Sequence, residues 1–519
     1  MTNSTRRNAR SLAETAFLLR EFLAPITTRF RPHFTVDTRS LAALRIALGT
    51  IVVVDLWHRA RSLEMFYTEG GVYPLSIHKA AYGQHGVFSI YSITDALWFQ
   101  SALFVIAGLF ALAFVAGYRT RLVGAISLVL LVSLHIRNPA VLNGGDRLLR
   151  VLLFVALLTP LGERWSIDSL RRGSARRSVV SVGTAALLAQ PLVVFTVNAV
   201  EKRRGEHWYT GEALELALYD GTMATSLGAA LLEFPTLLTW LTYGWIALLA
   251  GAIPLLLITT GRARALAATA YVLAFVGMGL TLSVGLFPLV LAASVVPFFT
   301  EPFWNWSVRR VPGRISERIS AMTAPRVLES ERVERRMYNR LKTRGYVPPV
   351  ARIASFRRVT WTIVATVVLL WILVFAAVDA TGSEPPAPLD SDHLDQQDWG
   401  LYAPDPASST HWHVVEAELE DGSTVDARRG GPVRYDRPPN ADTAYESFRH
   451  RSFLQTVSAS ENRNGPITDH YADWACERAS EISDADAERV TVYRRHQPKP
   501  VDGGFNLPET AVIAERSCR

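Results

Sequence analysis

Long apolar runs, interrupted by short polar segments, dominate the first 380 residues of the chain. Runs of membrane-spanning length lie near 41–58, 98–117, 122–137, 147–162, 179–200, 236–258, 265–283, 285–300 and 359–379. A helix needs about 20 apolar residues to cross a bilayer. The pattern predicts a mainly α-helical polytopic membrane protein with about nine transmembrane helices, eight of them within residues 35–300.

A different pattern begins after the last apolar run. Residues 380–398 form an acidic, proline-containing linker, and residues 399–519 carry short segments in which apolar and polar positions alternate. The run VVEAELEDGSTVDA alternates around Asp421-Gly422, which is a strong hairpin signal. RVTVYRR and TAVIAER resemble further strands, and a helix is expected around 441–457. Residues 399–519 are therefore predicted to be a small β-rich domain.

Charge divides the chain in the same way and predicts its orientation. Residues 380–519 hold 25 acidic and 14 basic residues, whereas residues 1–379 hold 22 acidic and 40 basic ones. Basic loops stay on the cytoplasmic side of a membrane. Loops 118–121, 163–178, 259–264 and 301–358 are then cytoplasmic, as is the segment 1–34, which lacks the features of a signal peptide. The domain 399–519 is predicted to be extracytoplasmic, and the basicity indicates contact with membrane lipids, not nucleic acid.

Three smaller features fall outside the spans. Val333, Met337 and Leu341 repeat every four residues in the basic loop 301–358, which indicates either an amphipathic helix on the membrane surface or a solvated charged helix. Cys476 and Cys518 both lie in the predicted outer domain, where oxidising conditions permit a disulfide, although sequence alone does not place them within bonding distance. His411 and His413 lack a third ligand in the sequence, so no metal is predicted.

Lys202 is the most unusual residue of the predicted outer membrane boundary. The chain has four lysines (Lys79, Lys202, Lys342 and Lys499) against 50 arginines, and arginine does not give up its proton. Asn198 lies four residues earlier, on the same helix face. A chemical role for the Lys202 amine and simple snorkelling to the interface both remain open.

The loop HIRNPAVLNGGDRLLR lies on the same predicted side. Asn143, Gly144, Gly145 and Asp146 read as a turn with an acidic cap on the next helix, and Arg150 can pair with Asp146. Capping explains Asp146, while two glycines would also let a ligand approach the backbone closely.

Three further ionisable residues are candidates. His135 is expected at the membrane level of this loop. Arg45 and Asp55 lie inside the first span, where charge is costly and usually faces a polar interior. They are ten residues apart and are expected to have different partners; a structural ion pair is the alternative to a functional role.

Several of these motifs are similar to one known family. SLAALRIALG, LNGGDRLLR and ERWSIDSL resemble the HTTM family, membrane proteins similar to vitamin K-dependent γ-glutamyl carboxylase. NAVEKRRGEHWYTGEAL resembles the stretch that carries the carboxylase's base lysine, followed by a tryptophan. QQDWGLYAPDP and HWHVVEAELEDGSTVD resemble the region after the spans in prokaryotic HTTM proteins.

The resemblance implies a reaction. A lysine amine deprotonates a reduced naphthoquinone, such as menaquinone, which reacts with oxygen; the resulting alkoxide removes a γ-proton from glutamate, and the carbanion captures carbon dioxide. Lys202 would be the base, and a peptide or protein substrate would lie on the outer face. With the candidates found above, the predicted substrate and quinone site contains Asn143, Gly144, Gly145, Asp146, Asn198, Trp208, His135 and Arg45.

Two departures keep a second hypothesis open. The spacing from Lys202 to Trp208 is one residue longer than in the carboxylase, and Gly144-Gly145 follows Asn143 where the carboxylase has a histidine. The chain is then either a quinone-dependent enzyme of the carboxylase type or a non-catalytic membrane protein that binds a lipid, quinone or protein partner.

Overall fold

The computed structural model describes residues 30–83, 88–310, 350–381, 402–459, 462, 465–499 and 507–518. Three expectations therefore lie outside the described residues: most of the N-terminal segment 1–34, the amphipathic helix around Val333, and nearly all of the linker 380–398.

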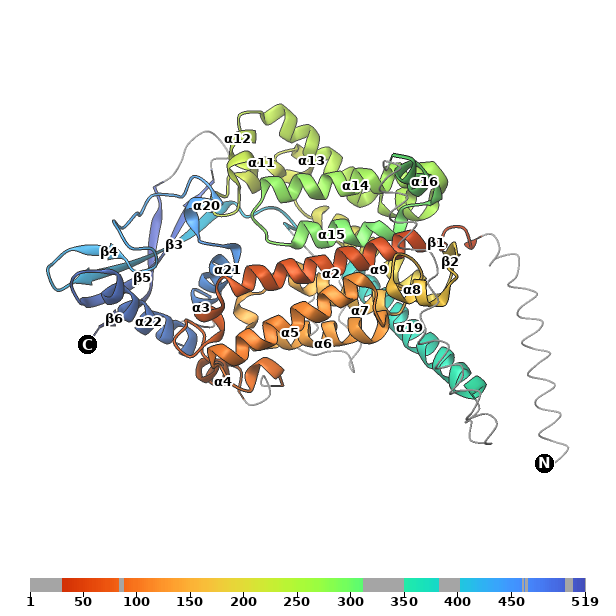
Figure 1. Cartoon of the computed structure of the whole chain (residues 1–519). Coiled ribbons are helices and arrows are strands. Elements are labelled where there is room, and N and C mark those ends of the chain that lie inside the picture. Colours follow the sequence, from red (N-terminus) through yellow and green to blue (C-terminus); the bar gives the residue numbers. More distant parts are fainter. Residues whose placement is uncertain are drawn as a thin grey trace, which may run out of the picture.

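The long helices of the membrane part form a bundle (Figure 1). In the described chain, six helices are long and apolar enough to cross a membrane, so this is a multi-pass membrane protein. They are α2 (Thr38–Ala60), α5 (Leu97–Ala116), α6 (Thr120–Arg137), α9 (Val182–Lys202), α14 (Gly261–Thr281) and α19 (Val350–Thr381).

The expected number of nine transmembrane helices is not confirmed, because three apolar runs form shorter helices. α7 (Gly144–Leu157) has 14 residues, a rise of about 21 Å against the ~30 Å of a bilayer core. α13 (Pro235–Ala250) ends at Gly251, and a π-helical turn, η4 (Ile253–Ile258), follows with Pro254 inside it.

The third short helix belongs to a bent pair. α15 (Phe287–Val295) passes into the 3-10 turn η5 (Val296–Phe298), where Pro297 lies, and the chain then bends by 108° into α16 (Glu301–Arg310). Proline cannot donate the backbone hydrogen bond that continues a helix. If this pair counts as one span, the described residues contain seven.

Short elements connect the helices at the two ends of the bundle (Figure 1). β1 and β2 pair antiparallel, with Val36 opposite Val179. These elements are β1 (Val36–Asp37), α3 (Leu63–Tyr67), α4 (Leu75–Tyr82), η2 (Ile90–Ser92), η3 (Pro139–Val141), α8 (Ile167–Arg172), β2 (Ser178–Val179), α10 (His207–Thr210), α11 (Ala213–Leu218) and α12 (Ser226–Leu231).

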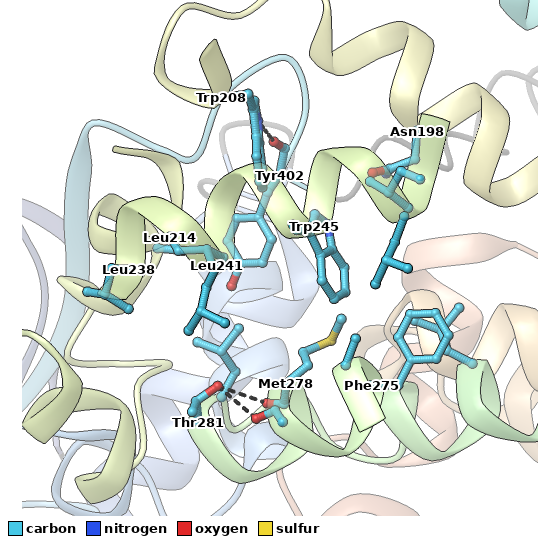
Figure 2. Close-up of a pocket in the computed structure, with 18 of the residues that line it drawn as sticks. Asn198, Trp208, Leu214, Leu238, Leu241, Trp245, Phe275, Met278, Thr281 and Tyr402 are labelled. Carbon is cyan, nitrogen blue, oxygen red and sulfur yellow. Dashed lines mark hydrogen bonds between the residues drawn. The ribbon is translucent and has the colours of Figure 1, made fainter. Parts of the chain in front are cut away.

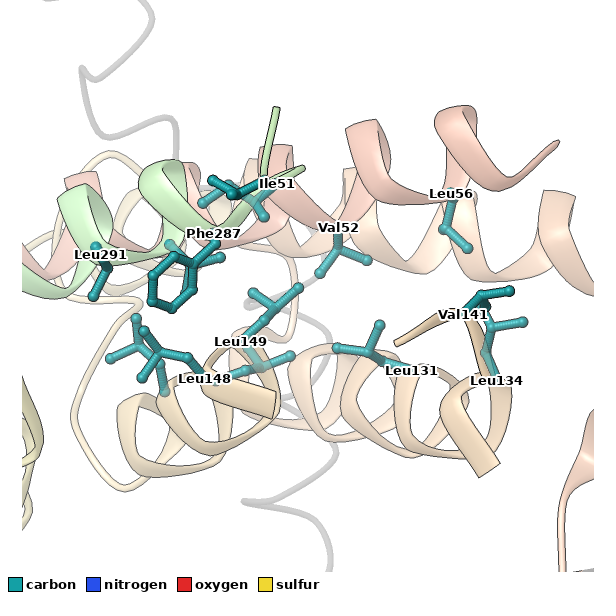
Figure 3. Packing of buried hydrophobic residues seen from close by; sticks show 14 of the residues in the cluster. Ile51, Val52, Leu56, Leu131, Leu134, Val141, Leu148, Leu149, Phe287 and Leu291 are labelled. Atoms are coloured by element: carbon teal, nitrogen blue, oxygen red, sulfur yellow. The ribbon is translucent and has the colours of Figure 1, made fainter. Parts of the chain in front are cut away.

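Most of the bundle interior is apolar, and so is much of its outside. Side chains of α2, α6, α7 and α15 meet in the core shown in Figure 3, where Val52, Leu131, Leu149 and Phe287 are buried. Outward-facing leucines such as Leu109 of α5 are exposed. Exposed apolar belts of this extent are expected where lipid replaces water as the solvent.

The C-terminal domain contains the predicted β-sheet. β3 (Ser409–Leu419), β4 (Thr424–Asp426), β5 (Ala487–Pro498) and β6 (Glu509–Ser517) form one antiparallel sheet of order β4-β3-β5-β6. The expected hairpin at Asp421-Gly422 is present: Glu416 pairs with Asp426, and Gly422 has a φ of +80°.

Helices complete this domain. The helix expected around 441–457 is two helices, α20 (Ala441–Ala444) and α21 (Phe448–Val457), and α22 (Pro466–Ile482) was not predicted. α22 packs on β5 and β6, and a disulfide joins its Cys476 to Cys518 beyond β6, with Cα atoms 5.3 Å apart. The domain lies at the bundle end formed by α3 and α12, away from α8 (Figure 1).

Candidate functional site

A cavity of about 700 Å³ lies between α9, α13 and α14. Its wall is mostly aliphatic and aromatic, and Figure 2 shows Trp245, Phe275 and Met278 lining it. Ligand pockets typically combine such an apolar wall with a few polar groups. Here three predicted site residues (Asn198, Lys202 and Trp208) line one end of the same cavity, and Thr281 lies toward the other end (Figure 2).

Lys202 is held at this end by two neighbours. Its side chain is 1% exposed, and its Nζ lies 4.1 Å from the centre of the Trp208 ring. Lys202 Nζ donates a hydrogen bond of 3.0 Å to the Tyr402 carbonyl oxygen. Trp208 Nε1 donates to the same oxygen at 3.1 Å (Figure 2). One carbonyl from the C-terminal region therefore fixes both side chains.

The segment that carries Tyr402 is tied to the corner between α9 and α10. The Asp405 carboxylate accepts hydrogen bonds from the backbone N–H groups of Glu206 (2.8 Å) and His207 (3.0 Å). Gly205 is needed there, because a Cβ at this position would lie 2.2 Å from the Pro404 carbonyl oxygen. Tyr402 was not among the predicted site residues. The run GLYAPDP resembles the region after the spans in HTTM proteins, but nothing in this run indicates a contact with Lys202.

A second buried polar cluster lies between the bundle and the C-terminal domain. Arg59 donates to Asp55 Oδ2 and to Asp146 Oδ1, both at 2.8 Å. Arg449 of α21 donates to Asp55 and lies 3.3 Å from Asp146 Oδ1. His135 Nε2 is 3.6 Å from the same oxygen. Two arginines thus balance two carboxylates, one arginine coming from each part of the chain.

This cluster contains the one trio of described residues whose spacing could hold a metal ion, namely Asp55, His135 and Asp146. Both carboxylates, however, already accept hydrogen bonds from guanidinium groups of Arg59 and Arg449. A guanidinium and a metal ion would compete for the same oxygen lone pairs. The donor set therefore fits an ion-pair network better than a metal centre.

The predicted turn of Asn143, Gly144, Gly145 and Asp146 forms a capping box on α7. Asn143 Oδ1 accepts from the N–H of Gly145 and Asp146, and Asp146 Oδ2 accepts from the N–H of Asn143. A Cβ on Gly145 would lie 2.8 Å from Phe287 Cα. Phe287 lines the cavity beside Lys202, whereas residues 143–146 do not. The turn therefore lies next to Phe287 and not on the cavity wall.

Arg45 lies elsewhere. Its guanidinium donates to the carbonyl oxygens of Leu161 (3.0 Å), Arg164 (3.1 Å) and Trp165. These residues precede α8, at the bundle end away from the C-terminal domain (Figure 1). Arg45 and Asp55 do have different partners, as expected, but Arg45 is not brought to the cavity with Lys202.

Lys499, His413 and His411 of the C-terminal region contact groups other than the cavity at Lys202. Lys499 Nζ donates to the Leu216 carbonyl oxygen of α11 at 2.6 Å, and burial lowers the pKa of Lys499 to about 8. His413 lies between Tyr445 and Ser458, at 2.8 and 3.0 Å, and burial, with Arg428 nearby, lowers its pKa to about 3. His411 stacks on His496, so the two histidines of β3 have separate neighbours.

The fold and the cavity define a multi-pass membrane protein whose helix bundle carries an apolar pocket with a buried lysine at one end. The sequence pattern of the HTTM domain matches residues 31–304, more than half of the chain and the part that contains Lys202. The chain belongs to the HTTM domain family. No curated protein and no solved structure matches it.

Proposed function

We propose that this protein binds a reduced naphthoquinone in the cavity beside Lys202 and uses the Lys202 amine as a base in a reaction of the γ-glutamyl carboxylase type. The observation that carries the proposal is the position of Lys202, the one amine among the described residues of the cavity wall. It is buried at one end of a space lined mostly by apolar side chains. A quinol has the matching shape, with hydroxyl groups on a flat apolar ring. When bound, the quinol would be the group that reacts with oxygen.

The chain's own residues would bind and orient this molecule. Trp245 and Phe275 offer aromatic faces to the ring, and Asn198 lines the cavity one helical turn before Lys202. A proton acceptor works within hydrogen-bond reach of the proton it removes. Lys202 Nζ would take the proton of a quinol hydroxyl placed beside it, and the low hydration of the cavity favours an uncharged amine over an ammonium group.

The cavity wall also suggests how such a ligand arrives. Trp240, Leu241 and Leu273 line the cavity and are exposed on the apolar outside of α13 and α14. An isoprenoid chain could therefore remain among lipids while the ring enters. Access from the bilayer suits a substrate that dissolves in membranes.

A protein substrate would approach from the side of the C-terminal domain, which we assign to the outside. The loop 163–178 carries five arginines, and the α8 region to which it belongs lies at the opposite end of the bundle (Figure 1). Basic loops are cytoplasmic. Menaquinone, oxygen, carbon dioxide and a glutamate-containing peptide are the proposed reactants.

The test measures both products of the reaction. Membranes containing the full chain are supplied with reduced menaquinone, oxygen and bicarbonate, and mass spectrometry follows quinone epoxide and glutamates heavier by one carboxyl group. Lys202→Arg keeps the charge but does not yield a free base, so both products should disappear. Lys499→Met is the matched control, because it removes another buried lysine that also donates to a backbone carbonyl. Activity of Lys202→Arg equal to wild type would contradict the base role.

One observation favours the second candidate, a non-catalytic membrane protein that binds a quinone or lipid. Lys202 and Lys499 both donate to a carbonyl across the boundary between the bundle and the C-terminal domain, so Lys202 could simply fasten the two parts. The histidine that the resemblance calls for after Asn143 is also replaced by glycine. If wild type forms no product while menaquinone still binds saturably, this second function stands and the enzymatic one fails.

A further inference from the structure

A second cavity, of about 500 Å³, lies on another face of α9, between α6, α7 and α19. Its wall is apolar except for two residues, Arg150 of α7 and Gln190 of α9. Gln190 is close to the middle of a candidate membrane span. Polar groups inside a helix bundle are costly unless something satisfies them, which makes them candidates for a binding site.

Among the described residues, Arg150 and Gln190 take part in no side-chain hydrogen bond or ion pair. Asp146, which the sequence suggested as the partner of Arg150, is engaged by Arg59 and Arg449. Arg150 therefore has the attraction of Asp146 at longer range but no direct contact with it.

Arg150 carries a positive charge that lies outside the ion-paired cluster. Asp55 and Asp146 are matched by Arg59 and Arg449 in the buried cluster. Arg150 is an additional cation on the same helix as Asp146 and stays charged at any ordinary pH. A bound anion could pair directly with Arg150, whereas a neutral ligand could not.

The cavity is open toward the lipid side of the bundle. Phe154 of α7 and Val367 and Trp371 of α19 line the cavity and are exposed on the outside. A ligand could therefore enter sideways from the bilayer with its apolar part among these side chains.

We propose that this cavity binds a single-chain lipid carboxylate, a fatty acid, with its carboxylate between Arg150 and Gln190. A guanidinium and a carboxylate match in geometry, because two parallel N–H groups meet two oxygens. The amide N–H of Gln190 can donate to the same head group. The acyl chain then lies along the apolar wall formed by α6 and α19. This site is separate from the cavity at Lys202 and does not depend on the function proposed there.

The experiment measures saturable binding of radiolabelled palmitate to the full chain in lipid nanodiscs. Arg150→Met should weaken binding about tenfold to a hundredfold, the range expected for loss of hydrogen bonds to a charged group. Arg150→Lys should retain more affinity than Arg150→Met. Lys202→Met, in the other cavity, is the matched control and should bind palmitate as wild type does.

A second variant does not alter the charged groups. Val367→Trp fills the cavity from the exposed wall of α19 and should also abolish palmitate binding. Excess methyl palmitate, which lacks the charge, should compete poorly with palmitate, as should menaquinone. Unchanged binding in both Arg150→Met and Val367→Trp would overturn the site, and equal competition by methyl palmitate or menaquinone would overturn the recognition of a carboxylate.

Discussion

Replacing Arg449 with methionine should destabilise the packing of the C-terminal domain against the helix bundle. Arg449 belongs to α21, yet its guanidinium reaches two carboxylates of the bundle, those of Asp55 and Asp146. It also donates to the Val141 carbonyl oxygen at 3.0 Å. Its side chain is 5% exposed, so solvent screens these contacts very little.

The magnitude follows from the charges that remain. Without Arg449, Asp55 and Asp146 share the single cation Arg59, and one buried carboxylate is left uncompensated. Removing one partner of a buried ion pair costs about 3–5 kcal/mol, because the other charge stays buried without its match. The additional variant Asp55→Asn, combined with Arg449→Met, restores equal numbers of positive and negative groups and should recover part of this loss.

The assay is thermal unfolding of the full chain in detergent, followed by tryptophan fluorescence, together with limited proteolysis that reports release of the C-terminal domain. Arg489→Met is the matched control: Arg489 also contacts two carboxylates, Glu418 and Glu515, but all three side chains are about half exposed. Exposed ion pairs contribute little to stability. The control should unfold as wild type does, while Arg449→Met should unfold earlier and lose its C-terminal domain to protease sooner.

Two results would refute this reasoning. Equal unfolding of Arg449→Met and Arg489→Met would mean that the buried cluster does not couple the two parts. A double variant no more stable than Arg449→Met would mean that charge balance is not what Arg449 provides.

Three further predictions concern the C-terminal domain and its contact with the bundle. Because the pKa of His413 is about 3 in the folded protein and about 6.5 when unfolded, its contribution to stability is present above pH ~6.5 and declines by about 1.4 kcal/mol per pH unit as the pH falls toward 3; denaturant unfolding at pH 7, 6 and 5 should show this slope, and His413→Gln should flatten it. Reducing the disulfide, or Cys476→Ser, should cost about 4 kcal/mol in the chain-entropy description of a loop with a separation of 42 residues; equal unfolding midpoints with and without reductant would contradict this. Gly285→Ala should destabilise by about 1–3 kcal/mol, because Gly285 has a φ of +65° and its Cβ would lie 2.6 Å from the Phe448 ring; Gly277→Ala, which meets nothing within 4 Å, is the control in the same unfolding assay.

The helices could be predicted from sequence more reliably than the number of spans. Apolar runs mark where α2, α5, α6, α9, α14 and α19 lie, because lipid-facing and core-facing side chains are both apolar. The runs do not mark where a helix ends inside the membrane. Gly251 and Pro297 end or bend helices within apolar sequence. A count of spans based on apolar composition alone does not detect such breaks.

The sheet of the C-terminal domain was also predictable, since alternation and the Asp421-Gly422 turn are local signals. α22 was missed, although buried Ile467, Tyr471 and Ala475 recur every four residues in it. This is a helical repeat, and it lies among segments whose alternating pattern favours strands.

The site was predicted in part. Asn198, Lys202 and Trp208 are close in sequence, and the structure brings them to one cavity. Tyr402 is 200 residues from Lys202, and Arg449 is 394 residues from Asp55. Contacts at such separations leave no periodic trace in a single sequence. Arg45 was grouped with the site because it is charged within a span. A span has two ends, however, and the Arg45 guanidinium binds carbonyl oxygens at the end away from the C-terminal domain.

The charge division of the chain describes its surfaces and not the contact between its two parts. Residues 380–519 are acidic and residues 1–379 are basic, which by itself would suggest that the acidic domain meets cations of the bundle. The buried contact is the reverse: the acidic domain contributes the cation Arg449, and the bundle contributes Asp55 and Asp146. Net charge is set by solvent-facing residues, whereas a buried contact must be neutral locally. The region that matches the HTTM domain ends at residue 304, so on its own it lacks both Arg449 and the Tyr402 carbonyl that holds Lys202. The candidate site is therefore complete only with the C-terminal region, which supplies the carbonyl that holds Lys202.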